Sequence, residues 1–461
     1  MSTPKSTPHS VKHACWIIRY PSQRTTKGSQ RIFTSSAPYF HPPPMSPSAA
    51  SPRLPQELVD SIIDELKNDV GSLRTCSLVS KPWVYRSRKY LFETVHLPTC
   101  LLRRWLKRIP VVPITPLGPH HHIRSLSLQP TAASAPFCVP EAFVDHLSSF
   151  TQVSKLFIAS TLWEEWTDAF SDNALVAKYF GGFGQTLRRL ELTRVYLNMV
   201  TLKALLDVFP QLESILIFSP TMVDEEVKSV EAFPHLREHR RIAEVESSSV
   251  TVPYKRAPIR LVDSITLLFP PKELVVGLAN LPLQCRKLVL VEDSDYGGDA
   301  FNLLLDCTGP TLESLIIRNT FDRGLTVTLE NCPVLCRLKT KAPYHGMLAY
   351  IDDQARLIQT VTSPFLSQIV FSGKWDDSQM GRATDWLEPV KWEMVDRELC
   401  NLMDRLDEEV EFEVVFADAT SLGEDEFEDI CCEQADSARA MLLNGVRTRG
   451  GVVKIQRTEL K

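Results

Sequence analysis

The sequence lacks several features that would place it in a familiar class at once. No stretch approaches the roughly 20 consecutive apolar residues that a membrane-spanning helix needs, so an integral membrane protein is not expected. No asparagine begins an Asn-x-Ser/Thr acceptor, and the eleven cysteines form no C-x-x-C pair. These absences disfavour secretion and a disulfide framework, and they predict a protein of the cytoplasm, the nucleus or both.

Motifs that carry catalysis or hold a cofactor are also missing. The chain has no G-x-S-x-G nucleophile elbow, no H-E-x-x-H motif and no phosphate-binding loop ending in G-K-[ST]. His120-His121-His122 has no acidic or cysteine partner at ligand spacing, so a solvated loop is expected rather than a metal site. The glycine-rich run 181–184 is interpreted as a turn. We therefore expect no catalytic residue, metal or cofactor.

The net charge is small, but the charges are unevenly distributed. A formal net charge of -5 leaves no basic footprint that would indicate nucleic-acid binding. Residues 1–52 contain no Asp or Glu and are rich in Ser, Thr and Pro, which predicts a disordered tail. A mitochondrial targeting segment would have the same basic, acid-free composition and is the alternative.

Three short amphipathic helices are predicted from residue 53 onward. Leu58, Ile62 and Leu66 recur at helical spacing, and Pro55 suits the first helical position. Gly71-Ser72 is expected to separate the first helix from the second, and Pro82 to begin the third. Because about 45 residues is near the size at which a core becomes marginal, docking onto a partner is expected.

The same segment carries a motif with many fixed positions. It reads Leu54-Pro55-x-Glu57-Leu58, Ile62, Leu73, Cys76-Ser77-Leu78-Val79-Ser80-Lys81-x-Trp83 and Arg88-x-x-Leu91-Phe92-x-x-Val95. This motif resembles the F-box family, and the resemblance implies an F-box over residues 53–97. An ordinary three-helix cap for the domain that follows is the alternative.

The resemblance to the F-box family also implies a function. An F-box would dock on the Skp-type adaptor of a cullin-RING ubiquitin ligase, and the remaining chain would hold an unknown target protein. The chain would then be a non-catalytic substrate adaptor; a scaffold with no role in ubiquitin transfer is the alternative. The matched positions expected to contact or support the Skp-type adaptor are Leu54, Pro55, Leu58, Ile62, Val79 and Trp83.

A short apolar signature recurs after residue 120. It reads apolar-x-x-apolar-x-apolar and begins at positions 123, 153, 187, 212, 262, 285, 312 and 366, with a shorter trace at Leu335-x-x-Leu338. Most intervals lie near the period of leucine-rich repeats, about 20 to 29 residues, and intervening segments such as 199–209 read as helices.

The recurrence predicts an α/β fold in which a small three-helix F-box is followed by a solenoid. After a linker at 98–120, residues 121–461 would form an irregular leucine-rich-repeat-like domain. The long interval between 212 and 262 could hold one degenerate unit around residues 233–236. A non-repeating α/β domain is the alternative.

Side chains between the apolar positions are expected on the opposite, concave side of these strands, because strand side chains alternate. Basic and apolar residues would meet there and bind a target with acidic and hydrophobic residues. A loop or tail that simply covers the strands is equally compatible with the pattern. The candidate target-binding residues are Lys155, Phe157, Arg189, Leu216, Phe218, Val289, Ile316 and Arg318.

The C-terminal region is expected to cap the repeat domain. Arg405 is the only basic residue between Asp404 and Glu433, and residues 410–416 alternate like a strand. A helix over 435–443 and a last strand over 452–455 would close the edge of the sheet. The acidic stretch is thus predicted as a solvated cap, or alternatively as a tail that folds back on the basic N-terminal segment.

Overall fold

The computed structural model is a mixed α/β protein whose chain divides into two units. It describes residues 54–98, 119–129, 147–159, 177, 179–222, 260–292, 299–319, 327–341, 347–374, 389–407, 410–419 and 443–457. The helical unit is the described part of the first unit, residues 54–91, and the sheet unit is Phe92–Lys461. The predicted tail and most of the predicted linker lie outside the described residues. None of the described helices is long and apolar enough to cross a bilayer.

The helical unit contains the three predicted helices. They are α1 (Gln56–Glu65), α2 (Val70–Val79) and α3 (Lys81–Glu93). Pro55 is the N-cap of α1 rather than its first helical residue, so that prediction was wrong by one position. Gly71 and Ser72 lie inside the first turn of α2 and do not break the chain, because the Asp69 carboxylate accepts a hydrogen bond from the Ser72 backbone N–H at 3.1 Å and caps the helix.

A small apolar core joins the three helices of the helical unit. Val59 and Ile63 of α1 and Leu73 of α2 are buried together. The partly buried side chains that pack against this core are Leu66, Trp83, Tyr90 and Leu91. Only one side of α1 is used in this way, because Val59 and Ile63 are four residues apart and project from one face.

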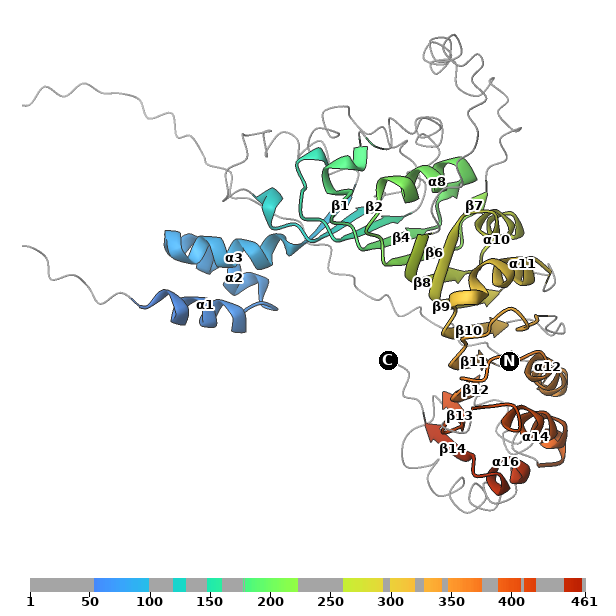
Figure 1. Cartoon of the computed structure of the whole chain (residues 1–461). Helices are drawn as coiled ribbons and strands as arrows, with labels where there is room; N and C mark the ends of the chain where they lie inside the picture. The colour runs from blue at the N-terminus through green and yellow to red at the C-terminus, as the bar shows by residue number, and fades with distance from the viewer. Residues whose placement is uncertain are drawn as a thin grey trace, which may run out of the picture. The chain divides into compact units, whose positions relative to one another are not determined.

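The sheet unit is built on one twelve-stranded parallel sheet whose strand order follows the chain (Figure 1). The strands are β1 (Thr94–Pro98), β2 (Ser125–Gln129), β3 (Lys155–Ala159), β4 (Arg189–Thr193), β6 (Ser214–Phe218), β8 (Arg260–Leu268), β9 (Leu283–Glu292), β10 (Ser314–Asn319), β11 (Arg337–Lys341), β12 (Gln368–Lys374), β13 (Glu413–Ala419) and β14 (Val452–Arg457). Every predicted signature lies at one of these strands, and the predicted C-terminal strands are confirmed as β13 and β14. The predicted α/β class is therefore confirmed.

The strand register aligns the signature residues into two buried apolar rows. The first row contains Val95, Leu126, Leu156, Leu190, Ile215, Ile265, Leu288, Leu315, Leu338, Ile369 and Val414. The second contains Leu97, Leu128, Ile158, Leu192, Ile217, Leu267, Leu290, Ile317 and Phe371. Thr340 interrupts the second row, which explains the shortened signature at β11, and its hydroxyl lies 2.8 Å from the buried Tyr350 hydroxyl.

Helices of the sheet unit lie along one side of the sheet (Figure 1). They are α8 (Met199–Val208), α10 (Lys272–Ala279), α11 (Asp299–Thr308), α12 (Met347–Gln359), α14 (Pro389–Met403) and α16 (Asn444–Thr448). The predicted helix at 199–209 is confirmed as α8. The helix predicted at 435–443 lies outside the described residues except for Leu443, which is the N-cap of α16.

Three strands of the sheet unit end in the same turn. Arg194, Ser219 and Phe269 follow β4, β6 and β8 directly and have φ of 51°, 44° and 52°. Each of their N–H groups donates a 2.7 Å hydrogen bond to the last or near-last carbonyl of the next strand, at Phe218, Leu268 and Val291. None of the three turn residues is a glycine, although this backbone region favours glycine, so no residue type marks the repeated turn in the sequence.

Two further sequence interpretations are corrected or refined. Strand β6 pairs directly with β8, and residues 233–236, where a degenerate unit was predicted, lie outside the described part. His122 is buried at 5% exposure after a short 3-10 helix, Pro119–His121, so the predicted solvated loop is wrong. The run 181–184 contains a tight 3-10 turn in which Gly182 lies against the Ser148 backbone, leaving no room for a Cβ.

Candidate protein-binding surfaces

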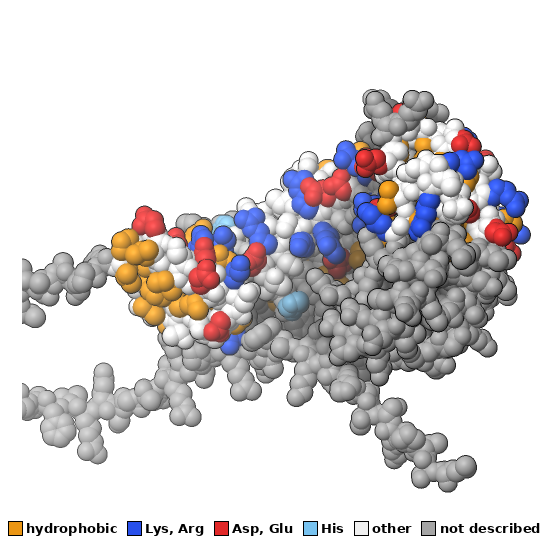
Figure 2. All heavy atoms as spheres, turned by 90° about the horizontal axis from the view of Figure 1, so that it is seen from below, with side chains coloured by type: hydrophobic (Ala, Val, Ile, Leu, Met, Phe, Trp, Pro, Cys, Tyr) orange, Lys and Arg blue, Asp and Glu red, His pale blue; other side chains and the backbone are white. Residues whose placement is uncertain are grey.

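The helical unit exposes a group of large apolar side chains, here called the apolar patch. Its members and their exposed fractions are Leu54 57%, Leu58 52%, Ile62 42%, Leu78 83% and Val79 60%. Figure 2 shows hydrophobic side chains gathered on this unit. Leu58 and Ile62 are four residues apart on α1 and share a face about 100° around the helix from the buried Val59 and Ile63, and Leu54 directly precedes the helix cap. Exposed apolar surface of this kind is a candidate protein-binding site.

Five of the six residues predicted to meet a partner are on the surface. Leu54, Pro55, Leu58, Ile62 and Val79 are exposed. Trp83 is half-buried and packs against the core of the helical unit. It is therefore part of the internal packing and not one of the exposed members of the patch. Leu78 is the most exposed member and was not singled out, although its place in the motif beside Val79 was a usable signal.

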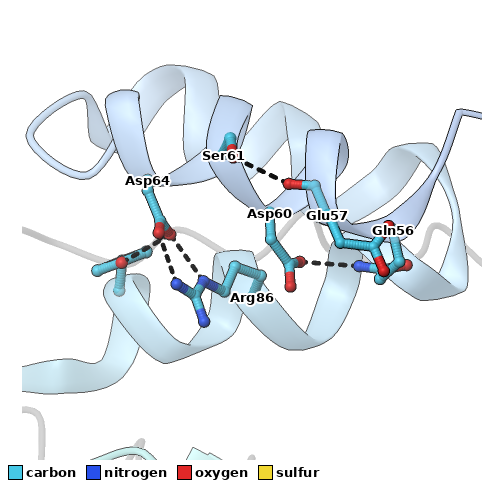
Figure 3. Close-up of polar contacts among 7 residues, drawn as sticks. Gln56, Glu57, Asp60, Ser61, Asp64 and Arg86 are labelled. Atoms are coloured by element: carbon cyan, nitrogen blue, oxygen red, sulfur yellow. Dashed lines mark hydrogen bonds and ion pairs between the residues drawn. The ribbon is translucent and has the colours of Figure 1, made fainter.

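A polar cluster ties α1 to α3 beside this core (Figure 3). Arg86 donates two hydrogen bonds to Asp64, from Nε at 2.7 Å and from Nη2 at 2.5 Å, and the Tyr90 hydroxyl donates a third at 2.8 Å. The hydrogen bonds from Arg86 and then Tyr90 lower the pKa of Asp64 to about 2. The carboxylate is therefore ionised at neutral pH and fixes the angle at which α1 presents its exposed face.

The eight predicted target-binding residues all lie on the side of the sheet opposite the two apolar rows, here called the open face. No described helix covers that side in Figure 1. Lys155, Arg189 and Arg318 are exposed on it. The apolar members are half-buried; they are Phe157, Leu216, Phe218, Val289 and Ile316. Alternation along each strand thus placed all eight on one face.

Charges on the open face are neutralised near both ends of the sheet. On β4, Arg189 Nε lies 2.6 Å from Glu191 Oε1. At the C-terminal end, Glu413 of β13 pairs with Lys454 of β14 and accepts a 2.6 Å hydrogen bond from Gln368. The hydrogen bond from Lys454, followed by that from Gln368, lowers the pKa of Glu413. These contacts leave little charge there for a ligand to satisfy.

Strands β9 to β11 carry basic side chains on the open face, and no acidic side chain of these three strands shares that face with them. Lys287, Arg318 and Arg337 are exposed and Lys339 is half-buried; these four form the cation cluster. None of them makes an ion pair within the described ranges. Desolvation, followed by the charge of Arg318, lowers the pKa of Lys339. The alternation of side chains along the strands assigns all four residues to this face. Only Arg318, however, was among the eight predicted target-binding residues.

Cys285 and Cys332 of the sheet unit are buried thiols. Burial raises the pKa of Cys285 and of Cys332 to about 12, so both are protonated thiols at neutral pH rather than nucleophiles. Across the described ranges, no group of three His, Cys, Asp or Glu side chains is placed to hold a metal ion.

Comparison with known proteins leaves the residues and their geometry as the basis for function. No protein-family model matches the chain. No curated protein matches it either.

Proposed function

We propose that this chain is the substrate-recognition subunit of a Skp-cullin-F-box type ubiquitin ligase. In this proposal the helical unit is an F-box that docks on the Skp-type adaptor through the apolar patch. The sheet unit is a leucine-rich-repeat-like solenoid whose open face holds the target protein. Other subunits carry out ubiquitin transfer, so the chain itself is non-catalytic and acts in the cytoplasm, the nucleus or both.

The observation that carries the proposal is the apolar patch. Leu54, Leu58 and Ile62 are exposed on a unit whose own core contains only three fully buried apolar side chains. A unit of this size gains little stability by itself, and each exposed leucine or isoleucine could add about 1.5–3 kcal/mol when buried by a partner. Leu54, Leu58, Ile62, Leu78 and Val79 of the F-box-like motif are exposed, whereas its Leu73, Cys76, Phe92 and Val95 are buried.

The strand arrangement supports the second half of the proposal. Successive strands pair in parallel, and the connections that precede β6, β9, β10, β12, β13 and β14 carry α-helices that lie along one side of the sheet. One strand and one covering segment per unit is the construction of a leucine-rich repeat, and such arrays bind proteins along the strand face. Strand β8 is longer than β6 and the intervals are unequal, so the repeats are irregular.

Affinity capture from cells tests the ligase proposal. The tagged wild-type chain should retain both the Skp-type adaptor and a cullin, whereas the double substitution Leu54→Ala/Pro55→Ala should lose both. Leu58→Ala should weaken capture about tenfold or more, because it removes one central apolar anchor. Leu261→Ala is the matched control, since Leu261 is a 47% exposed leucine on β8.

The outcomes separate this function from a scaffold role. Full capture by the Leu54→Ala/Pro55→Ala variant would contradict docking through the apolar patch. A wild-type chain that retains target proteins but neither ligase subunit would favour a scaffold with no role in ubiquitin transfer. Hydrogen exchange in β8 to β11 checks that the sheet unit of each variant remains folded.

A further inference from the structure

The cation cluster has a defined layout on the open face. Lys287 and Arg337 share one row across the sheet, on either side of Ser314. Val289, Ile316 and Lys339 form the next row, and Arg318 lies two residues further along β10. With strands about 4.8 Å apart and about 3.3 Å per residue, the cluster spans roughly 10 Å across the strands and 13 Å along them.

In this layout the positive charge of Lys339 is partly desolvated and has no ion-pair partner among the described residues. Lys339 is half-buried on β11, between β10 and β12, and its pKa is lowered by desolvation and then by the like charge of Arg318. The acid that interacts with Arg337 is Glu413, two strands away and already paired with Lys454. An anionic ligand would relieve both the desolvation of Lys339 and the repulsion from Arg318.

The chemistry between the cations indicates a peptide rather than a nucleic acid. Val289 and Ile316 are half-buried aliphatic side chains at the centre of the cluster. On β9 to β11 no aromatic side chain faces this side, although stacking on aromatic rings is the usual way to hold nucleic-acid bases. The cations are spread over three strands and do not converge on one point, which suits several carboxylates better than a single phosphate group.

We propose that the open face of β9 to β11 binds an acidic peptide segment in which an aliphatic side chain is flanked by carboxylates. The aliphatic side chain packs on Val289 and Ile316, and the carboxylates pair with Arg318, Lys339 and the flanking cations. Only the identification of this segment as part of a ligase target rests on the proposed function. The binding chemistry itself stands on the cation cluster alone.

Fluorescence anisotropy with the full chain tests the assignment. The probe is a short fluorescein-labelled peptide that alternates Asp or Glu with Leu, titrated to about 1 mM, a concentration that detects even weak complexes. The double substitution Arg318→Gln/Lys339→Gln should weaken binding about tenfold, from a few-fold for each partly desolvated pair. Arg188→Gln is the matched control and should change binding by less than about twofold, because Arg188 lies outside β9 to β11 and already pairs with Glu213 at 2.9 Å.

Three competing ligands complete the experiment. A peptide with Asn and Gln in place of the acids, a phosphoserine peptide and an oligodeoxythymidine should all bind more weakly than the acidic probe. Absence of acidic-peptide binding, or equal affinity of the wild-type chain and the double variant, would overturn the proposal. Tighter binding of the phosphopeptide or the oligonucleotide would overturn the choice of carboxylates.

The same samples separate this proposal from the ligase proposal. Leu54→Ala/Pro55→Ala should leave peptide binding unchanged, since the substituted residues belong to the helical unit. If the wild-type chain fails to capture the Skp-type adaptor but binds the acidic peptide, the ligase proposal fails and this one stands. The reverse result refutes the peptide site and leaves the ligase proposal in place.

Discussion

The two units of the chain use apolar residues in opposite ways. In the sheet unit, the residues of the two apolar rows are directed to the side that the helices cover, and both rows are almost fully buried. In the helical unit, α1 divides its apolar residues between a small core and a face on which Leu58 and Ile62 are exposed at 52% and 42%. Hydrophobicity alone therefore does not distinguish residues that hold a fold from residues that remain available to a partner. Adjacent residues in each unit allow this contrast to be measured.

The largest expected effect comes from Leu315 and its neighbour Ile316 on β10. Leu315 is 0% exposed in the apolar row, so Leu315→Ala should lower the free energy of unfolding of the sheet unit by about 3 kcal/mol. Ile316→Ala removes a half-buried side chain on the open face and should cost about 1 kcal/mol or less. Urea denaturation followed by circular dichroism measures both; equal losses would contradict the assignment of the two faces.

The corresponding pair in the helical unit is Ile63 and Ile62 on α1. Ile63 is 0% exposed, and Ile63→Ala should cost about 2–3 kcal/mol, enough to unfold much of so small a unit. Ile62→Ala should leave its stability within about 0.5 kcal/mol, because Ile62 is 42% exposed. Hydrogen exchange of α1 and α2 reports each change, and strong destabilisation by Ile62→Ala would show that this face has an internal structural role.

A smaller loss of stability is expected at Thr340, the polar residue that occupies a position in the second buried apolar row. Thr340→Val leaves the Tyr350 hydroxyl buried without its 2.8 Å partner and should cost about 1–2 kcal/mol. Adding Tyr350→Phe removes the orphaned hydroxyl, and the double variant should recover most of the loss. Additive losses in the double variant, measured by urea denaturation, would indicate that the two hydroxyls do not stabilise each other.

The smallest effect concerns the Asp64 cluster and depends on pH. Because the folded pKa of Asp64, about 2, lies below its ordinary value of 3.8, its contribution is complete above about pH 4 and is lost as the pH falls toward 2. Solvent screening at this partly exposed pair limits the contribution to about 1 kcal/mol or less. Asp64→Asn should destabilise α1 at pH 7 but not at pH 2, as measured by circular dichroism of thermal unfolding. An equal loss at both pH values would point to packing rather than charge.

Much of the sheet could be predicted from sequence because its signal is repeated and physically simple. Each strand must bury two apolar positions separated by one residue, and this spacing survives even where the intervals vary. The shortened signature at Leu335-x-x-Leu338 is instructive, since Thr340 occupies a buried position with a hydroxyl partner on α12. Only a tertiary contact makes that threonine acceptable, so no local pattern could have predicted it.

The errors arise where local chemistry depends on distant packing. Gly71 looked like a break, but the Asp69 cap allows α2 to begin before it. The three consecutive histidines looked solvated, but the ring of His120 lies 5.5 Å from that of Phe150 and His122 is buried. For the candidate site, alternation identified the open face, whereas the importance of Lys339 depends on its position beside Arg318 on the neighbouring strand.

Pairing between strands that follow one another along the chain also governs how the sheet unit can fold. No pairing in the twelve-stranded sheet requires distant parts of the chain to meet, so each new strand closes only a modest loop, whose entropic cost grows slowly with length. Folding can then proceed by successive addition, with β1 available first during synthesis and each later strand adding to the newest edge. A chain interrupted after β11 would already contain all four residues of the cation cluster. Strand β11 would then be the unpaired edge of its sheet, and this edge would need to be covered.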